Sequence, residues 1–232
     1  MAEMIPVSVS ELTNSSAEKK LFDLFKRDEK LKNSVVFHSV GVEKCLKRSF
    51  AEIDFIVCVP GGGVFALEVK GGRVSRREDG VWIYTDREGI GHEKVYSPYN
   101  QASHGLDSLF ENYLKNTPVE NVLRGYGIMF PDVVFNNTDP DITQEIIFDF
   151  RDGEKVGDYI FRLSGYYKSK IGYTSKVFVP TATDIDTIKK IIRKPFDWSI
   201  PLPRKLDEVN SRLVKLTEQQ YMCAVGLRMN RQ

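Results

Sequence analysis

The sequence has few cysteines and no long apolar run. Its 232 residues include only Cys45, Cys58 and Cys223, which are too few and too scattered for a disulfide framework or a zinc site. No run approaches the about eighteen consecutive apolar residues of a transmembrane helix. The first residues also lack the basic start and apolar core of a secretory signal peptide. We therefore expect a cytoplasmic protein without a membrane span.

Neither sign of charge is in clear excess. Lysine and arginine total 33 against 32 acidic residues, which gives a formal net charge of +1. The net charge therefore does not indicate a nucleic-acid partner, and such a partner would have to bind local basic clusters. Taken alone, each cluster is more typical of an ordinary solvated surface than of a binding site. Candidates include Arg73 with Arg76 and Arg77, and Lys189-Lys190 with Arg193-Lys194.

Two apolar segments joined by glycines lie in the stretch EIDFIVCVPGGGVFALEVKG, residues 52–71. The pattern predicts strands at Ile53–Val59 and Val64–Lys70, connected by a hairpin at Gly61-Gly62-Gly63. The triple glycine is not a phosphate-binding loop, because no helix start and no G-K-[ST] follows it. A charge inside a buried strand costs several kcal/mol unless a partner balances it. The charged residues of these strands are therefore expected to meet.

Three charged side chains occupy the ends of the two strands. Glu68 and Lys70 share one face because side chains alternate along a strand, and the hairpin brings Asp54 roughly opposite them. Carboxylate oxygens suit Mg²⁺ or Mn²⁺, which also bind water and phosphate oxygens. Lys70 could orient a water and stabilise charge on a phosphate. The cluster predicts a metal site, although an E-x-K triplet alone is also typical of a solvated salt bridge.

Asp54 followed by Glu68-Val69-Lys70 resembles the D…(D/E)-x-K signature of the P-D-(D/E)-x-K nuclease superfamily. With Gly80-Val81-Trp82, Tyr96-Ser97-Pro98 and Asn100-Gln101-Ala102, the sequence is similar to the nuclease-related domain called NERD over roughly Glu18 to Tyr113. The resemblance implies Mg²⁺ (or Mn²⁺) bound by Asp54, Glu68 and the Val69 carbonyl, with Lys70 acting on the attacking water. It also implies supporting roles for Glu18 and Gln101.

Several of these residues have a second interpretation. Glu18, in the first turn of a predicted helix, would also complement the helix dipole. Gln101 departs from the Q-x-x-x-Y motif of exonuclease-like branches, because Gly105 stands where tyrosine would. His38 is more typical of a packed or surface histidine than of a catalytic base. Asp149, near a strand end, could join the metal site or be an unrelated acid.

The order of elements predicts an α/β fold in which a central mixed sheet of about five strands carries helices on both faces, as in restriction endonucleases. Gly41 to Ala51 is expected to be a charged connector or short helix, and Trp82 a core residue, with base stacking as the alternative. Predicted helices are Ser16–Arg27, Pro98–Lys115, Val156–Lys170 and Asp184–Ile192, and predicted strands besides the central hairpin include Asn33–Val40, Val81–Tyr84, Gly125–Phe130 and Glu145–Phe150.

The composition changes after Pro195. We expect a nuclease-like domain at 1–194, a proline-containing linker at 195–204 and a helical tail at 205–232. The segment Leu216 to Tyr221 resembles the L-T-x-x-Q segment that precedes the ATP-binding loop of superfamily one helicases. It is also consistent with an ordinary helix capped by Thr217. The resemblance implies a helicase motor, linked or associated, as a partner and a chain that is part of a longer protein.

The sequence thus favours a metal-dependent nuclease that hydrolyses phosphodiester bonds in DNA. The alternative from another class is a non-cleaving module that binds nucleic acid for a helicase. A third interpretation, a domain that only docks a protein partner, has no supporting motif.

Overall fold

The computed structural model divides into two compact units, Met1–Lys194 and Pro195–Gln232, each of which is described by itself. The second contains helix α5, Leu202–Met229. Half of the linker predicted at 195–204, residues 197–201, lies outside the described residues. The structure describes residues 1–11, 13–45, 48–86, 89–137, 139–172, 176–196 and 202–229.

A mixed six-stranded sheet forms the centre of the first unit, in the order β1-β2-β3-β4-β8-β9. Strands β2, β3 and β4 are antiparallel, whereas β1 with β2, β4 with β8 and β8 with β9 pair in parallel. Every residue of β4 is buried, as expected of a strand covered on both faces. The strands are β1 Glu3–Ile5, β2 Val35–Cys45, β3 Arg48–Val59, β4 Gly63–Val69, β8 Arg124–Phe130 and β9 Ile147–Asp149.

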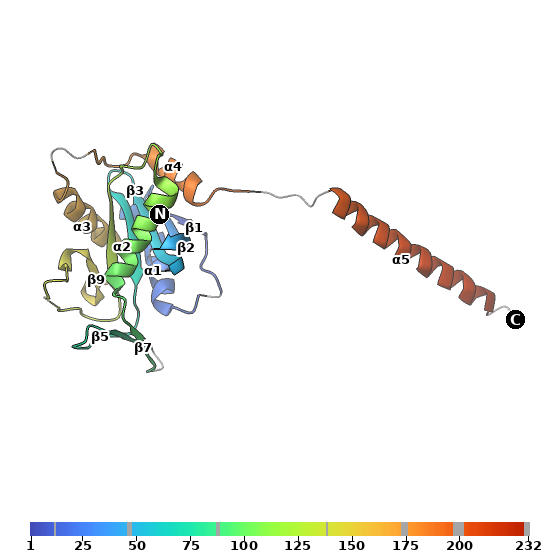
Figure 1. The fold of residues 1–232 in the computed structure, drawn as a ribbon, viewed down its shortest axis with the longest axis horizontal. Coiled ribbons are helices and arrows are strands. Elements are labelled where there is room, and N and C mark those ends of the chain that lie inside the picture. The colour runs from blue at the N-terminus through green and yellow to red at the C-terminus, as the bar shows by residue number, and fades with distance from the viewer. Residues whose placement is uncertain are drawn as a thin grey trace. The chain divides into compact units, whose positions relative to one another are not determined.

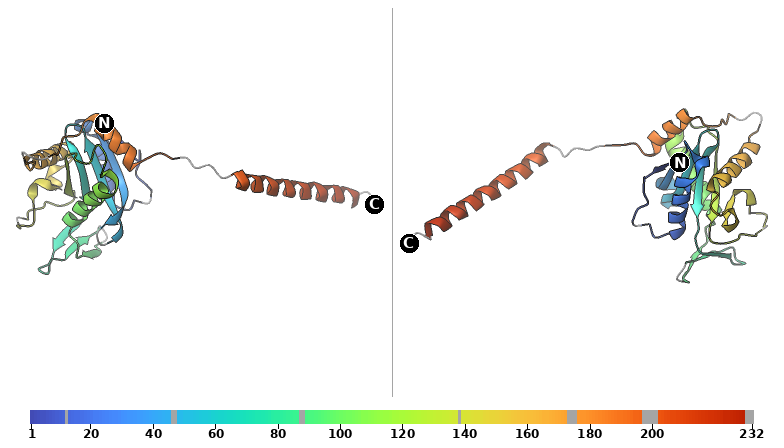
Figure 2. Two further views of the ribbon diagram at one scale, coloured as in Figure 1. Left: turned by 45° about the horizontal axis from the view of Figure 1, so that its top comes forward. Right: turned by 180° about the vertical axis from the view of Figure 1, so that it is seen from behind.

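Helices cover both faces of this sheet. Helix α2 lies in front of the strands in Figure 1, and the reverse view in Figure 2 shows α1 and α3 on the other face. From Phe55 to Val69, the odd-numbered strand side chains, such as Phe55 and Leu67, pack with α1 and α3, whereas even-numbered ones such as Ile56 and Ala66 pack with α2 and α4. The period of two thus divides the core into two layers. The helices are α1 Ser16–Arg27, α2 Pro98–Leu109, α3 Val156–Ser169 and α4 Ala182–Ile192.

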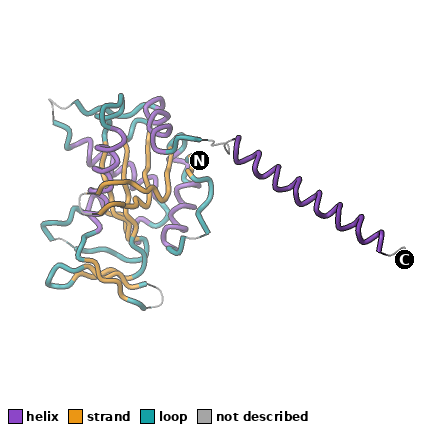
Figure 3. Tube along the Cα trace, turned by 45° about the vertical axis from the view of Figure 1, so that its right-hand side comes forward, coloured by secondary structure: helices purple, strands orange, loops and turns teal. Residues whose placement is uncertain are grey.

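A small antiparallel sheet follows β4 directly and appears as the lower group of orange strands in Figure 3. It consists of β5 Arg73–Arg76, β6 Trp82–Thr85 and β7 Gly91–Lys94. Trp82 is buried in a cluster with Ala102 and Phe130, which confirms its prediction as a core residue. Of the helices in the described residues, none is long and apolar enough to cross a bilayer.

The predicted α/β architecture is correct, and its helices are where the sequence placed them. Helix α1 has the predicted bounds, and the Ser15 hydroxyl accepts a hydrogen bond from the Glu18 N–H at 3.2 Å. Helix α4 begins two residues earlier than predicted because Thr181 and Asp184 form a capping box. The sequence therefore determined these elements through their apolar spacing and their caps.

Several local features differ from the predictions. The charged segment at 41–51 is no connector, because β2 runs to Cys45 and β3 begins at Arg48. Val42 is buried between exposed Gly41 and Glu43, which is the alternation of a half-buried strand. The charged residues of the segment make this alternation hard to recognise in the sequence. The sheet gains a sixth strand, β1, which is too short to show a pattern.

Thr217 does not cap a helix. It lies inside α5 and donates a hydrogen bond to the Leu213 carbonyl at 2.9 Å. The tail helix begins at Leu202, ahead of the predicted 205. Proline is tolerated in the first turn of a helix, so Pro203 did not delay the start.

Candidate functional site

Strands β3 and β4 stop pairing at the point where the charged residues lie. Phe55 and Leu67 are the last partners in register. Beyond them Asp54 Oδ2 accepts a hydrogen bond from the Val69 N–H at 2.7 Å, so a carboxylate replaces a bond of the ladder. The N–H and C=O of one strand residue face the same neighbouring strand, so the Val69 carbonyl faces this opening too. Asp54 and Val69 therefore present oxygen atoms at the same opening of the sheet.

Glu68 and Lys70 lie next to this opening. Glu68 is only 4% exposed and shares a strand face with Ala66, toward α2. The Lys70 ammonium turns inward and donates a hydrogen bond to Glu68 Oε1, and its side chain is 19% exposed. The structure thus brings two carboxylates and one ammonium together in a largely buried place.

The electrostatics of this place show an excess of negative charge. Burial raises the pKa of Asp54 well above its usual range, and repulsion from Glu68 raises it further, against the opposing effect of Lys70. Burial likewise raises the pKa of Glu68, although Lys70 offsets part of the effect. Burial alone would lower the pKa of Lys70, but attraction to Glu68 and Asp54 outweighs it and raises the pKa. One ammonium does not balance these carboxylates, which is the condition that a bound cation relieves.

Glu18 reaches the same site from α1. Its negative charge contributes to the raised pKa values of Asp54, Glu68 and Lys70, so its influence extends beyond the dipole of its own helix. Glu18 Oε2 lies 3.2 Å from His38 Nε2. Sequence patterns did not reveal this partner.

His38 is a packed histidine, in line with the sequence, and it also orients a charge. It is 1% exposed, and its ring lies 5.6 Å from the Phe22 ring and 4.9 Å from the Phe55 ring, centroid to centroid. These contacts hold the imidazole in place from both sides. The imidazole consequently fixes the direction of the Glu18 carboxylate.

Gln101 lies in the first turns of α2. Its side-chain oxygen is buried and, among the described residues, has no hydrogen-bond partner. Gly105 stands where the Q-x-x-x-Y motif has tyrosine, and packing gives a reason for the glycine, because a Cβ there would lie 2.9 Å from Ile53 Cγ1. A tyrosine therefore does not fit at 105, and Gln101 stands without the second residue of the Q-x-x-x-Y motif.

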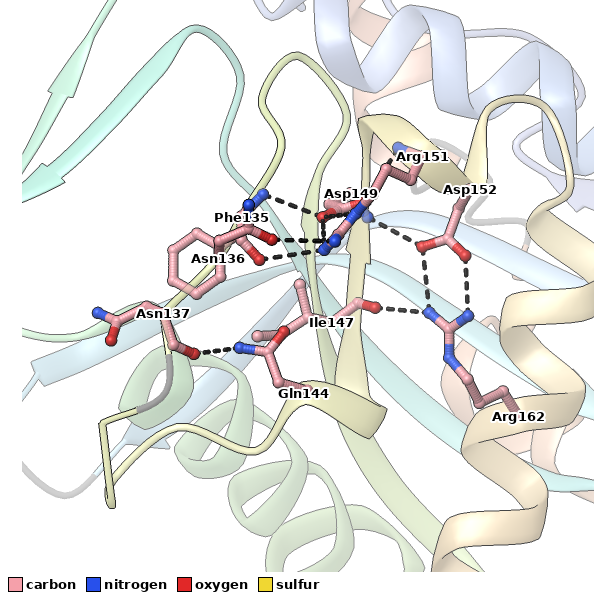
Figure 4. A network of polar contacts seen from close by, with 9 residues as sticks. All are labelled: Phe135, Asn136, Asn137, Gln144, Ile147, Asp149, Arg151, Asp152 and Arg162. Carbon is pink, nitrogen blue, oxygen red and sulfur yellow. Dashed lines mark hydrogen bonds and ion pairs between the residues drawn. The ribbon is translucent and has the colours of Figure 1, made fainter.

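Asp149 belongs to a separate network, which Figure 4 shows. Its carboxylate accepts hydrogen bonds from the Phe135 N–H at 3.0 Å and from the Arg151 guanidinium. Asp152 completes a capping box with it and is itself bound by Arg162. Burial opposes ionisation, but the bonds from Arg151 outweigh it and lower the pKa of Asp149. Of the two interpretations of Asp149, the unrelated acid is correct.

The basic cluster on the small sheet is largely neutralised. Arg76 forms ion pairs with Asp139 and Asp141. Arg77 pairs with Asp79 and Glu93. Only Arg73 of the predicted cluster lacks an ion pair within the part of the chain that the structure describes, so these arginines offer little free positive charge.

The donor set limits which metals the site could hold. Across the described ranges, no group of three or more histidine, cysteine and acidic side chains is arranged to bind a metal. Asp54, Glu68 and the Val69 carbonyl offer oxygen ligands alone. Mg²⁺ and Mn²⁺ fit this set, because Mg²⁺ commonly takes one or two carboxylates and fills its other positions with water and substrate phosphate. The excess of buried negative charge is consistent with that fit.

One of the comparisons with known proteins found a match. A family model described as NERD, nuclease-related domain, matches residues 13–141, which is more than half of the chain. No curated protein and no solved structure matches the chain. The matched range includes Glu18, Asp54, Glu68, Lys70 and Gln101, whereas Asp149 lies outside it.

Proposed function

The chain belongs to the NERD family of nuclease-related domains, and from this premise we propose that it hydrolyses phosphodiester bonds in nucleic acid, with DNA as the substrate and Mg²⁺ or Mn²⁺ as the cofactor. One observation carries the proposal. The half-buried Asp54 and the buried Glu68 repel each other and have raised pKa values, and Lys70 supplies too little positive charge to balance them and Glu18. Buried like charges that destabilise the fold are typical of functional sites.

Asp54, Glu68 and the Val69 carbonyl would hold the metal. When bound, it would lower the pKa of a water molecule and neutralise charge on the phosphate. Asp54 is already fixed by the Val69 N–H, so one carboxylate is preorganised for this purpose. Glu68 Oε1 accepts a hydrogen bond from Lys70, so the metal would share the Glu68 carboxylate with Lys70 or displace it.

The remaining side chains would act on water and substrate. The Lys70 ammonium can donate hydrogen bonds to an attacking water or to a phosphate oxygen. Glu18, oriented by His38, can accept a hydrogen bond from a water at the same opening. The Gln101 oxygen, buried without a partner among the described residues, can accept another. These groups would position the nucleophile, which is the larger part of what a protein contributes to phosphoryl transfer.

Digestion of supercoiled plasmid and of end-labelled strands, in Mg²⁺, Mn²⁺ or chelator, tests the proposal. We expect cleavage only with metal, and a loss of about 10²–10³-fold or more in Glu68→Gln and Lys70→Met. Glu154→Gln is the matched control, because Glu154 is exposed ahead of α3. The plasmid reports internal cleavage and the labelled strands report cleavage from an end, so the same panel separates endonuclease from exonuclease action.

The alternative function is a nucleic-acid-binding module that does not cleave. It predicts metal-independent binding of DNA that Glu68→Gln leaves unaltered, together with no cleavage under any condition. Association with a helicase motor, based on Leu216 to Tyr221, stays a prediction. Co-purification of the full-length protein with ATPase activity would test it.

A further inference from the structure

Tyr84 lies against Lys70 although it comes from the other sheet. Its side chain, on β6, is 7% exposed, and Lys70 Nζ lies 5.5 Å from the centroid of its ring. Trp82 stacks beside it, with centroids 6.4 Å apart and planes 13° apart. An aromatic face at this distance attracts a cation, and more so when water is excluded. The small sheet therefore contributes one wall of the site.

The Tyr84 hydroxyl is buried and, within the described residues, forms no hydrogen bond. A buried hydroxyl without a partner destabilises the fold, so each such group calls for an explanation. The Glu68 carboxylate lies close enough that its charge, after burial, contributes to raising the pKa of the Tyr84 phenol. The free hydroxyl therefore belongs to a ring whose face lies against the Lys70 ammonium of this ion pair.

The position of Lys70 depends on Glu68. An ammonium has three protons to donate, and the Glu68 carboxylate is its side-chain partner among the described residues. A divalent cation that binds Glu68 would compete with Lys70 for the same carboxylate. Lys70 is only 19% exposed, so the displaced ammonium needs another partner inside the protein.

We propose that Tyr84 is a positioning residue that holds the Lys70 ammonium, through its ring face and its hydroxyl, when Glu68 is drawn to a divalent cation. The inference rests on the proposed function, because it requires a cation at Glu68. The hydroxyl then gains its missing partner in the metal-bound state. Lys70 is also kept beside the reacting phosphate.

Tyr99 provides a matched comparison. Its hydroxyl is also buried, and no described residue bonds to it. Burial raises its pKa as well, but the charges that act on it are those of Asp141 and Arg76, and not Glu68. Tyr99→Phe therefore removes the same atom from a place that Lys70 does not use.

Calorimetric titration with Mn²⁺ tests the proposal without requiring turnover. We expect Tyr84→Phe to weaken Mn²⁺ binding about tenfold, because the released ammonium has lost its acceptor. Tyr99→Phe should bind Mn²⁺ as the wild type does. Lys70→Met should bind it at least as tightly as the wild type, since the competing cation is gone, and adding Tyr84→Phe to Lys70→Met should then change nothing.

Thermal unfolding in chelator checks the fold of each variant, and Tyr84→Phe should unfold no earlier than the wild type because it loses an unpartnered hydroxyl. Mn²⁺ affinity that is equal in Tyr84→Phe and wild type overturns the role of Tyr84 and leaves the nuclease proposal standing. An equal weakening in the Lys70→Met background overturns it too, because the effect would not pass through Lys70. A wild type that binds no Mn²⁺ overturns the metal-dependent function, and the inference with it.

Discussion

Replacing Asp54 by asparagine should make the metal-free protein more stable while it abolishes metal binding. The substitution removes one of two carboxylates that repel each other in a largely buried place. The asparagine side-chain oxygen can still accept the hydrogen bond from the Val69 N–H, and Glu68 keeps Lys70 as its counter-charge. Each pKa unit by which folding raises the pKa of Asp54 corresponds to about 1.4 kcal/mol of lost stability at a pH above the raised pKa. For a domain of this size that corresponds to a rise in Tm of about 2–4 °C per kcal/mol.

The pH dependence follows from the direction of the pKa shift. A carboxyl whose pKa is higher in the folded chain than the usual 3.8 binds its proton more tightly when folded. Its contribution to stability is fully present below the unfolded pKa and is lost as pH rises through the raised pKa of the folded state. The wild type in chelator should therefore lose stability as pH rises above about 4, and Asp54→Asn should lose less. The difference should be largest at neutral and alkaline pH.

Differential scanning calorimetry in chelator, at several pH values between about 5 and 8, measures this difference. Asp23→Asn is the matched control, because Asp23 is exposed on α1 and should change stability by less than about 0.5 kcal/mol. Asp54→Ala should have the opposite sign, since it leaves the Val69 N–H without a partner. A lower Tm for Asp54→Asn at pH 8 would refute the reasoning, because it would mean that the carboxylate stabilises the metal-free fold.

Three further results are expected. Mn²⁺ at about a hundred times its Kd should raise the free energy of unfolding of the wild type by about 2.7 kcal/mol in a thermal-shift assay, and Asp54→Asn should show no such rise. His38→Phe keeps an aromatic ring between its neighbours but frees Glu18, so it should slow cleavage about tenfold with a stability change below about 1 kcal/mol. An unchanged rate would remove His38 from the site. Asp149→Ala should destabilise the fold by about 2–4 kcal/mol in chemical denaturation, and cleavage per folded molecule should stay at the wild-type rate.

The sequence predicted the part of the site that one hairpin builds. Strand alternation and the glycine turn are local, and they are sufficient to place Glu68 and Lys70 together and to bring Asp54 opposite them. The helix that carries Glu18 was equally predictable, because its cap and its apolar spacing are local too. These patterns predict structure well here because each involves residues close together in the sequence, and because packing of the core requires the apolar spacing.

Contacts between distant elements could not be predicted in this way. The pairing of His38 with Glu18 depends on how α1 packs across β2, which apolar spacing does not specify. The sequence predicts Tyr84 only as one residue of a strand, because nothing in the sequence shows that the small sheet folds back onto Lys70. The signal that identifies it, a buried hydroxyl without a partner in the described part of the chain, exists only in three dimensions.

Glycine at 105 shows how packing can decide which parts of a family motif a chain retains. A Cβ at this position would lie only 2.9 Å from Ile53 Cγ1, so a side chain here would require Ile53 or α2 to shift. On the same helix, Ala102 packs in one cluster with Trp82 and Tyr84 of the small sheet. A tyrosine at 105 would require Ile53 or α2 to shift, and a shift of α2 would separate Ala102 from Trp82 and Tyr84.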